Sequence, residues 1–481
     1  MARHGAAVPR GLDVDPGPGP YPGRFGRMFP DRPACEADAE AIERLVELME
    51  RRQGTRQNLS VPAGFTYLGQ FIDHDITLDP TPVVDKQRDP CALVNFRTPR
   101  LDLDSVYGLG PTVQPFLYDW RESEPPGTRL LVGHNAVDAT DDLPRNQQGR
   151  ALIGDARNDE NVIVAQLHLL FIHFHNAVVD HLVRQGTPDG QLFETAQRIV
   201  RWHYQWIVVH DFLPRVVGPE MADRVLAPAG DGTAPTTGRE FFRWRREPFI
   251  PVEFSGAAYR FGHSMVRSDY GLKRLPPTGA GQPAIPLFPH LSGFTWLPKA
   301  HVIDWERFFK LDRRAPQASS TIDTAIATPL FHLPEGDPKL PRRNLLRGLK
   351  LGLPSGQEVA SAMRQSALTE EELRLDGTVE RHVRRVLLRS TPLWYYILCE
   401  AETGGGERPG PAGRHLGAVG GRIVAEVLVG LLEGDPSSYL GEEPSWRPGE
   451  LGTSGDFTMA TLVSFAQRAT RQPPSGSSTP G

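Results

Sequence analysis

One segment, reading LGQFIDHD at positions 68–75, carries an amide, two carboxylates and an imidazole among apolar residues. If the segment is helical, Gln70 and His74 lie on one face, four residues apart, and Asp73 lies beside Gln70. Asp75 then points about 100° away from His74. Side chains of these types rarely gather for packing alone. The segment therefore indicates an active site or a metal site, with Asp75 serving a separate purpose behind the reactive face.

A second acidic segment, reading TPRLDLD at positions 98–104, presents oxygen atoms at every second residue. In an extended loop alternate residues point the same way, and hard oxygen ligands of this kind suit calcium. The candidate ligands are Thr98, Arg100 through its carbonyl, Asp102 and Asp104, with Asp75 completing the set from a distance. On spacing alone, an ordinary aspartate-rich turn explains the segment at least equally well.

Charged residues also precede the most apolar segment of the chain, in GDARNDE at positions 154–160. Asp159 or Glu160 could simply face the positive end of a helix dipole. Arg157 differs, because its permanent charge and forked donors could polarise a bound oxygen species opposite His74.

Two downstream segments offer groups that suit a large flat ligand. In YRFGHSM at positions 259–265, His263 follows a glycine, where such a ligand could approach the backbone. In RNLLRG at positions 343–348, Asn344 could supply an amide for this histidine, and Arg347 a guanidinium for an acidic ligand group. Taken alone, a single histidine is more often a core residue than a ligand.

A helical period dominates the elements that must position these groups. Apolar residues recur at helical spacing over 35–52, 161–185, 192–209, 355–363, 369–389, 392–402 and 422–432. Ser355 and Glu358 predict a capping box, and the segment after Asn161 is apolar on nearly every face, which predicts a central buried helix. Strand-like alternation is scarce. The predicted fold class is mainly α, with few short strands.

Composition favours one large globular domain. The chain of 481 residues is 39% hydrophobic, which suffices for a core, and no internal linker long enough to separate two cores is visible. We expect a disordered or extended arm over residues 1–25, a single domain over 26–471 and a disordered tail over 472–481.

Charge and cysteine content limit the kinds of partner and the cellular compartment that we expect for this protein. The net charge of −5 comes from interleaved acids and bases, which argues against nucleic acid as a partner and favours a small molecule. Three widely spaced cysteines without a CxxC motif exclude a disulfide framework and a thiolate zinc site. Without a signal-peptide core or an uninterrupted apolar run, we expect a cytoplasmic protein with no membrane span, or one exported by a non-Sec route.

Taken together and in this order, five segments resemble those of the animal-type haem peroxidases, the myeloperoxidase-like branch of the peroxidase-cyclooxygenase superfamily. The segments are GQFIDHD, TPRLDLDSVYG, GDARNDE, YRFGHSM and RNLLRGLKLGLP, and they span about residues 64–356. The resemblance implies a single helical haem-peroxidase domain that binds haem b and calcium. It also implies hydrogen peroxide and a small electron donor as substrates, and a place in the response to oxidative stress.

On the distal side of the haem, the resemblance implies that His74 is the catalytic histidine, Arg157 the distal arginine and Gln70 the distal amide. In the mechanism that it implies, His74 takes a proton from hydrogen peroxide and returns it to the leaving oxygen. Arg157 stabilises the charge that develops as the O–O bond breaks.

On the proximal side, the resemblance implies that His263 is the iron ligand. Asn344 would accept the ring N–H of His263, which increases the imidazolate character of the ligand and favours high-valent iron. By the same resemblance, Arg260 and Arg347 lie near the haem propionates.

The resemblance further implies covalent attachment of the haem and a calcium site. Asp73 and Glu160 match the carboxylates that form esters with haem methyl groups. The residues that match the calcium ligands are Asp75, Thr98, Arg100, Asp102 and Asp104. Asp104 stands where relatives have serine, which adds negative charge to the site.

Two departures from the family pattern bear on the substrate. Asn161 stands where the strongest chloride oxidisers carry a haem-linked methionine, so the expected donors are bromide, iodide, thiocyanate or phenols. The main alternative is a cyclooxygenase-like fatty-acid dioxygenase, which needs a tyrosine three residues before the proximal histidine. That position is Arg260, and Tyr259 is offset by one. A haem-binding or adhesion module without activity is a further alternative, against which the complete set of His74, Arg157 and His263 argues.

Overall fold

The computed structural model describes residues 23–54, 56–78, 94–95, 97–122, 125–228, 237–245, 247–274, 283–404, 412–451 and 455–471. Most of the expected N-terminal arm and all of the expected tail lie outside the described residues. Cys91 lies outside them too, and the two described cysteines, Cys35 and Cys399, are unpaired.

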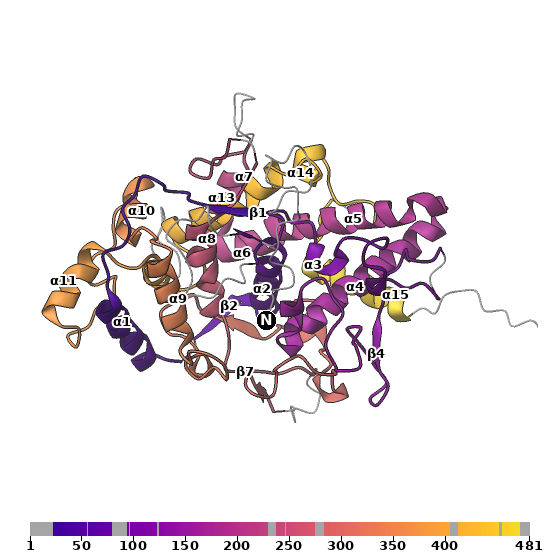
Figure 1. The fold of residues 1–481 in the computed structure, drawn as a ribbon, viewed down its shortest axis with the longest axis horizontal. Coiled ribbons are helices and arrows are strands. Elements are labelled where there is room, and N and C mark those ends of the chain that lie inside the picture. Colours follow the sequence, from indigo (N-terminus) through magenta and orange to yellow (C-terminus); the bar gives the residue numbers. More distant parts are fainter. Residues whose placement is uncertain are drawn as a thin grey trace, which may run out of the picture.

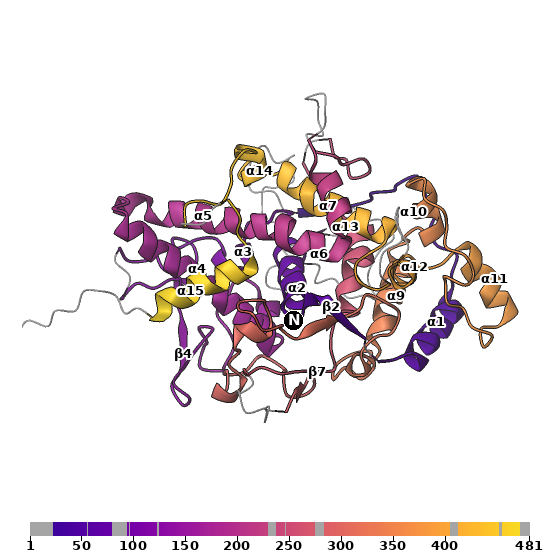
Figure 2. The ribbon, with the colours of Figure 1, turned by 180° about the vertical axis from the view of Figure 1, so that it is seen from behind.

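A long buried helix, α4 (Val162–Arg184), organises one half of the fold, as its apolar sequence predicts. It packs against α5 (Leu192–Ile207), α15 (Met459–Arg471) and α2 (Gly64–Ile76). Figures 1 and 2 show α4, α5 and α15 side by side at one end of the molecule, with α2 near the middle. Among the described helices only α4 has the length and apolar composition to cross a membrane, but 89% of its most apolar stretch is buried inside the protein.

A second buried helix, α13 (Ala418–Glu433), organises the other half. The helices packed against it are α6 (Leu213–Val217), α7 (Pro219–Leu226), α8 (Val252–Gly256), α10 (Gly356–Ala362), α12 (Leu393–Thr403) and α14 (Tyr439–Glu442). The far end in Figure 1 is formed by α1 (Ala39–Arg51), which packs against α9 (Leu340–Lys350) and α11 (Arg381–Arg389). A short helix, α3 (Asp104–Tyr107), contacts both α2 and α4.

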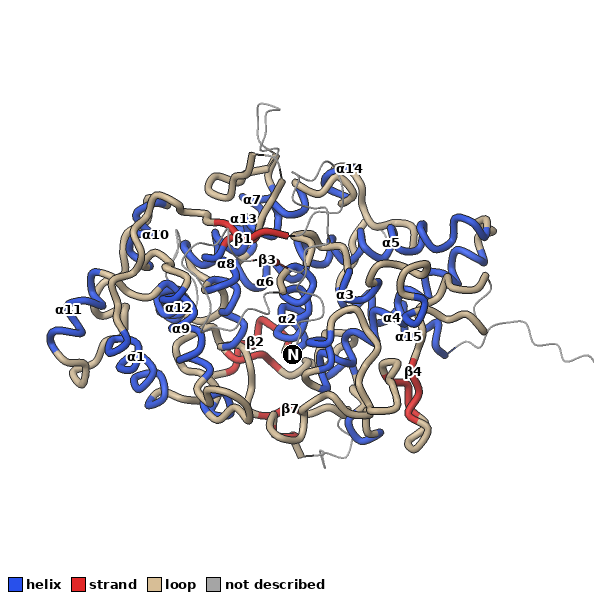
Figure 3. Tube along the Cα trace, in the orientation of Figure 1, coloured by secondary structure: helices blue, strands red, loops and turns tan. Residues whose placement is uncertain are grey.

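The strands are short and join segments that lie far apart in the sequence. β1 (Gly23–Gly26) pairs antiparallel with β3 (Val94–Asn95) and parallel with β6 (Ile250–Pro251). The antiparallel pairs are β2 (Gln57–Pro62) with β9 (Ala318–Ser320), β4 (Gly133–Asn135) with β5 (Thr140–Asp142), and β7 (Asp269–Tyr270) with β8 (Ile285–Pro286). Figure 3 shows them as short red segments between blue helices, which confirms the mainly α fold class.

The helix predicted over residues 369–389 is only half right, because α11 begins at Arg381. Upstream of it, Arg374 takes a left-handed backbone conformation with φ 56°, and the carboxylate of Asp376 accepts from the backbone N–H of Thr378 at 2.9 Å. Local turns built by polar side chains therefore replace the helix in the first half of the segment. The helical pattern also misses α9 and α15.

The predicted helix starts at Ser355 and Asn161 are confirmed. Ser355 Oγ accepts from the backbone N–H of Glu358 at 3.2 Å. Asn161 Oδ1 accepts from the N–H groups of Ile163 and Val164 at 3.1 and 2.9 Å, so this side chain caps the central helix α4.

Candidate active site

Helix α2 carries the reactive segment and ends beside a cavity. Packing holds the helix in place, since Phe71 and Ile72 are fully buried and no side chain caps its start. His74, in its last turn, is only 5% exposed. A cavity of about 210 Å³ opens at this end, and its lining includes Asp73, Thr77, Arg157, Arg260 and Arg347. Residues from four distant parts of the sequence meet there.

His74 is held by a buried asparagine that the sequence analysis did not single out. Its Nδ1 lies 2.8 Å from Oδ1 of Asn158, so the ring nitrogen donates to the amide oxygen. Burial, followed by the positive charge of Arg157, lowers the pKa of His74 to about 4. The ring is therefore neutral at neutral pH, with its lone pair on Nε2, which lies 4.0 Å from Oε1 of Glu160.

Glu160 and Gln70 are the polar residues next to His74. The Gln70 amide donates to the carboxylate of Glu160 and accepts from Nδ2 of Asn161 at 3.2 Å. Burial among protein groups raises the pKa of Glu160 to about 7, although 41% of its side chain remains exposed. Asn161 therefore both caps α4 and fixes Gln70.

Arg157 lies beside His74, but it contacts the backbone of that residue and not its ring. Its Nη2 donates to the carbonyl oxygens of His74 and Thr77 at 3.1 and 2.5 Å, at the open end of helix α2. Nη2 also donates to Asp155 at 2.7 Å, and Nε donates to both oxygens of that carboxylate at 3.2 Å. Although burial opposes it, Arg157 holds the pKa of Asp155 well below its usual range. The guanidinium lines the cavity from this position.

His263 ends a 3₁₀ turn, Ala258–His263, that packs against α2. Its Nδ1 lies 2.8 Å from Nδ2 of Asn344 on α9, so the predicted pairing of these two residues is present. The direction is the reverse of the expected one, because the amide nitrogen faces the ring. Oδ1 of Asn344 accepts from Nη1 of Arg260 at 3.3 Å. Because a guanidinium can only donate hydrogen bonds, Arg260 requires the amide oxygen, and the amide nitrogen is left to face His263. Burial, then Arg260 and Arg347, lower the pKa of His263 to about 3.

Arg260 and Arg347 bring positive charge to the cavity, and the carboxylate whose charge acts on both of them is Asp73. Among the described residues, no carboxylate forms an ion pair with either guanidinium, and Arg260 donates only to the carbonyl of Ser255 and to Asn344. Burial, followed by the charge of Arg347, lowers the pKa of Arg260 to about 9. Two partly buried cations at one cavity favour an anionic ligand there.

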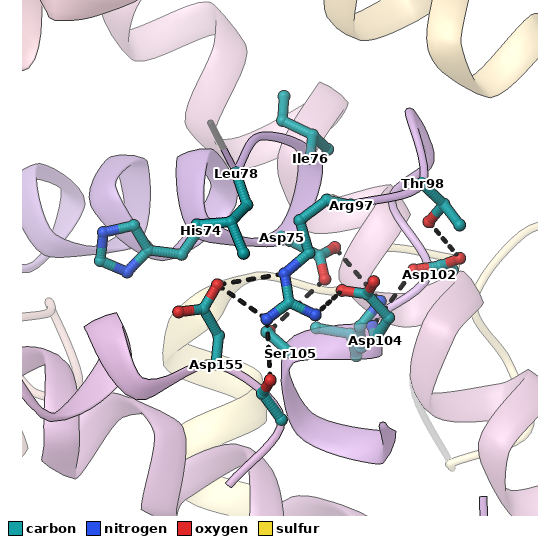
Figure 4. A network of polar contacts seen from close by, with 12 residues as sticks. His74, Asp75, Ile76, Leu78, Arg97, Thr98, Asp102, Asp104, Ser105 and Asp155 are labelled. Atoms are coloured by element: carbon teal, nitrogen blue, oxygen red, sulfur yellow. Dashed lines mark hydrogen bonds and ion pairs between the residues drawn. The ribbon is translucent and has the colours of Figure 1, made fainter. Parts of the chain in front are cut away.

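The acidic segment folds against the back of α2, as Figure 4 shows. Asp75, Asp102 and Asp104 each place one carboxylate oxygen within 4.8 Å of the others. Burial, then the charges of Asp102 and Asp104, raise the pKa of the fully buried Asp75. Thr98 Oγ1 donates to Asp102 at 2.8 Å. The structure therefore gathers the four predicted side-chain ligands, whereas the side chain of Arg100 turns to Asp435 at 3.8 Å.

Arg97, which no local sequence pattern marks, connects this acidic cluster with Arg157 through Asp155. Its Nη1 lies 3.1 Å from Asp104, while Nη2 and Nε lie 2.8 and 3.1 Å from the carboxylate of Asp155. Figure 4 shows Arg97 between Asp104 and Asp155. Because Asp155 also accepts from Arg157, which lines the cavity, a line of ion pairs connects the acidic cluster with the cavity.

A family model described as animal haem peroxidase matches residues 81–355, more than half of the chain. The chain belongs to the animal haem peroxidase family. This confirms the resemblance recognised in the five sequence segments. The family implies haem.

Similar curated proteins carry peroxidase names. The chorion peroxidase of Drosophila melanogaster is 30% identical over 186 residues, which cover 36% of this chain and 22% of that protein. A peroxidase-like protein of Margaritifera margaritifera is 27% identical over 363 residues, covering 60% of this chain and 44% of that protein. The chain thus spans less than half the length of these two relatives.

Solved structures support the fold. Peroxidase A from Dictyostelium discoideum superposes with a TM-score of 0.64 at 16% identity, over 92% of this chain and 93% of the other. A fatty acid alpha-dioxygenase from Oryza sativa superposes with a TM-score of 0.59 at 15% identity, over 86% and 76% of the two chains. At these identities the likeness concerns the fold.

The residues of this haem peroxidase chain fit a bound haem. His263 is neutral and can ligate iron, and a methyl group added at Gly262 would meet nothing within 4 Å, so there is open space beside it. Arg260 and Arg347 suit the two haem propionates. His74 and Gln70 on α2 provide polar groups for the opposite face.

Asn158 and Arg97 are the residues that sequence patterns miss in this family member. Asn158 lies inside the GDARNDE segment, but nothing in its spacing shows that its amide meets His74. Arg97 precedes the acidic segment by one position, and a lone arginine there carries no distinguishing signal. Both roles arise from tertiary contacts.

Proposed function

We propose that this chain is a haem peroxidase that uses hydrogen peroxide to oxidise bromide, iodide, thiocyanate or phenols. The observation that carries the proposal is the neutral His74, whose Nδ1 donates to Asn158 and whose Nε2 lone pair is free to take a proton. A bound haem supplies the iron that binds the peroxide and stores its oxidising equivalents. All other steps belong to side chains of the chain.

On the distal side, Nε2 of His74 takes a proton from the bound peroxide and returns it to the leaving oxygen. General acid–base assistance of this kind commonly contributes about 10²–10⁴ in rate. Arg157, which lines the cavity at the end of α2 and bonds the carbonyl of His74, contributes positive charge where negative charge develops on oxygen. Gln70, held between Glu160 and Asn161, presents an amide to the small donor or to water.

On the other side of the site, His263 would ligate the iron, and Asn344, 2.8 Å from its Nδ1, would orient the ring. Arg260 and Arg347 would bind the propionates of the haem. Asp73 and Glu160 are the candidates for ester links to the haem. The raised pKa of Glu160, about 7, favours its neutral acid form, and Oδ1 of Asp73 accepts from the Thr77 hydroxyl at 3.0 Å.

We also propose that calcium binds the acidic cluster. Its ligands are Asp75, Thr98, the carbonyl of Arg100, Asp102 and Asp104. The gathering of three carboxylates that are at least partly buried supports this, because a divalent cation relieves their mutual repulsion. Asp75 directly follows His74, so the ion would brace the distal histidine from behind.

The alternative is a fatty-acid dioxygenase, since alpha-dioxygenases share the fold. Against it, the position three residues before His263 is Arg260, whose guanidinium is engaged with Asn344. Tyr259 is buried against Phe254, with ring centroids 4.6 Å apart. Oxygen uptake with linoleate in the wild type, absent in His263→Ala, would favour this alternative.

The test of the proposed function is peroxide-dependent oxidation by haem-loaded protein. Guaiacol, bromide and thiocyanate are supplied separately, and we expect turnover of at least one of them by the wild type and none by His263→Ala. Acid-acetone extraction of the same protein examines the ester links, which predict that haem stays attached. A haem-loaded protein that turns over none of these donors would contradict the proposal.

A further inference from the structure

A fully buried amide links the distal histidine to the central helix. Asn158 lies in the 3₁₀ turn Ala156–Asp159 and has no exposed surface. Its Oδ1 is 2.8 Å from Nδ1 of His74. Its Nδ2 is 3.0 Å from Nδ1 of His168 on α4, a residue that is 1% exposed. One side chain thus contacts two buried histidines, one with each end of its amide.

We propose that Asn158 is the positioning residue for His74 and that His168 fixes the orientation of its amide. The inference rests on the proposed peroxidase function, in which Nε2 of His74 takes the proton of the peroxide. Neither residue touches the substrate. Both act by deciding which nitrogen of His74 carries hydrogen.

The orientation matters because the two ends of an amide have almost the same shape but opposite hydrogen-bonding roles. With the oxygen of Asn158 toward His74, hydrogen resides on Nδ1 and the lone pair on Nε2. With the amide reversed, its nitrogen would donate to Nδ1 and hydrogen would reside on Nε2. His74 would then be unable to accept the proton of the peroxide.

His168 supplies the asymmetry that selects one orientation. Nδ2 of Asn158 lies 3.0 Å from Nδ1 of His168, so this ring nitrogen is the acceptor and the ring hydrogen resides on Nε2, while burial lowers the pKa of His168 to about 3 and keeps the ring neutral. Its other nitrogen, Nε2, has no hydrogen-bond partner among the described residues. The ring of Phe71 lies nearly perpendicular to that of His168, at 6.1 Å between centroids and 76° between planes.

The direct test is nitrogen-15 NMR of the histidine rings in the full chain, in a diamagnetic state, either haem-free or with carbon monoxide on ferrous haem. For the wild type we expect His74 with hydrogen on Nδ1. For His168→Phe, which keeps a ring and removes the acceptor, we expect a mixture of both tautomers. The matched control is His175→Phe, because His175 is fully buried on the same helix but bonds Tyr107 and the carbonyl of Thr128. That control should leave the tautomer of His74 unchanged.

Peroxide kinetics of the haem-loaded protein provide the second readout. Asn158→Leu should lower kcat/KM for hydrogen peroxide by about 10–100-fold, the range typical for partners of a functional histidine. His168→Phe should cost about 2–13-fold, as expected for one lost hydrogen bond. Haem content should remain at the wild-type level in both variants. The KM for the reducing donor should not change.

Three results would overturn the proposal. They are hydrogen on Nε2 of His74 in the wild type, a tautomer that His168→Phe leaves unchanged, and equal losses in His168→Phe and His175→Phe. Asn158→Asp keeps the acceptor oxygen and the size of the side chain, so it replaces Asn158→Leu in the test if that variant fails to fold. In Asn158→Asp we expect His74 to retain hydrogen on Nδ1. If the tautomers are as expected but neither the wild type nor any variant reacts with peroxide, the proposed peroxidase function fails and the positioning role of Asn158 stands.

Discussion

Two histidine–asparagine pairs, one on each side of the cavity region, look alike but differ in the direction of one hydrogen bond. Nδ1 of His74 lies 2.8 Å from Oδ1 of Asn158, and Nδ1 of His263 lies 2.8 Å from Nδ2 of Asn344. Both rings are neutral because burial lowers their pKa values, to about 4 and about 3. The same two residue types therefore give opposite arrangements of the ring hydrogen.

The difference comes from the third residue in each group. His168 accepts from the nitrogen of Asn158, whereas Arg260 donates to the oxygen of Asn344. His74 is left with a free lone pair on Nε2, as a base requires. His263 is left with hydrogen on Nε2, so for Nε2 to ligate the iron of a haem, the Asn344 amide would have to turn its oxygen toward Nδ1.

The largest effect that separates the two pairs is the loss of His263. In His263→Ala the iron loses its protein ligand, so we expect haem occupancy to fall to less than a tenth of the wild type. The absorbance ratio of the Soret band to the protein band measures it. Added imidazole, which can enter the vacated space, should restore part of the band in this variant, and a variant that keeps full occupancy without imidazole would break the assignment of the proximal side.

Loss of His74 should leave the haem bound and slow the reaction with hydrogen peroxide. In His74→Ala we expect haem content close to that of the wild type and a kcat/KM for hydrogen peroxide that is lower by about 10²–10⁴. Stopped-flow mixing with peroxide measures the rate. Equal haem loss in His74→Ala and His263→Ala would show that the two sides do not differ in the way proposed.

Replacement of Asn344, the amide beside His263, further distinguishes the two histidine–asparagine pairs. Asn344→Leu should weaken haem binding by about tenfold, the lower end of the range for residues that support a metal ligand. The matched Asn158→Leu variant should leave haem affinity unchanged, because its histidine does not bind the iron. Titration of both variants with hemin measures the two affinities. A loss of haem affinity in Asn158→Leu of the same size would contradict the division of roles.

Removal of calcium should affect the His74 side of the site and not the His263 side. Asp75 belongs to the acidic cluster and directly follows His74, whereas no residue of the cluster neighbours His263 in the sequence. Treatment with EGTA should lower the peroxide rate and the Tm, since a ligand present at 100 times its Kd contributes about 2.7 kcal/mol of stability. Readdition of calcium, but not of magnesium, should reverse both effects. An unchanged Tm would contradict the calcium proposal.

The smallest predicted effect concerns the stability of the protein below neutral pH. Burial lowers the pKa values of His168 and His175 to about 3 and about 4, from an ordinary value near 6.5. Below pH 6.5 the unfolded chain therefore binds more protons than the folded chain, and stability falls as the pH decreases toward 4. Replacement of either histidine by phenylalanine should flatten this dependence in Tm measurements between pH 7 and pH 4.5.

Local sequence patterns are sufficient to predict much of this molecule. The buried helix α4, its start after Asn161 and the shared face of Gln70 and His74 follow from spacing within one segment. The five ordered segments identify the family. The predicted helix over residues 369–380 fails because turns formed by Asp376 and Arg374 compete with it at short range.

The remaining features depend on contacts between distant segments, which no single-segment pattern contains. The roles of Asn158 and Arg97 arise where a 3₁₀ turn meets α2 and the acidic loop. The direction of the bond between Asn344 and His263 depends on Arg260, which comes from another element. Competition for one amide between two neighbours can be recognised only when all three residues are placed in space.

The central claim is that His74 and His263 perform different tasks around one haem. Stopped-flow spectra of haem-loaded protein mixed with hydrogen peroxide test it most directly. We predict a rapid change of the Soret band in the wild type that guaiacol, bromide or thiocyanate reverses, a full Soret band that changes at least about 100-fold more slowly in His74→Ala, and little or no band in His263→Ala. A wild type that binds haem but shows no spectral change with peroxide would contradict the account.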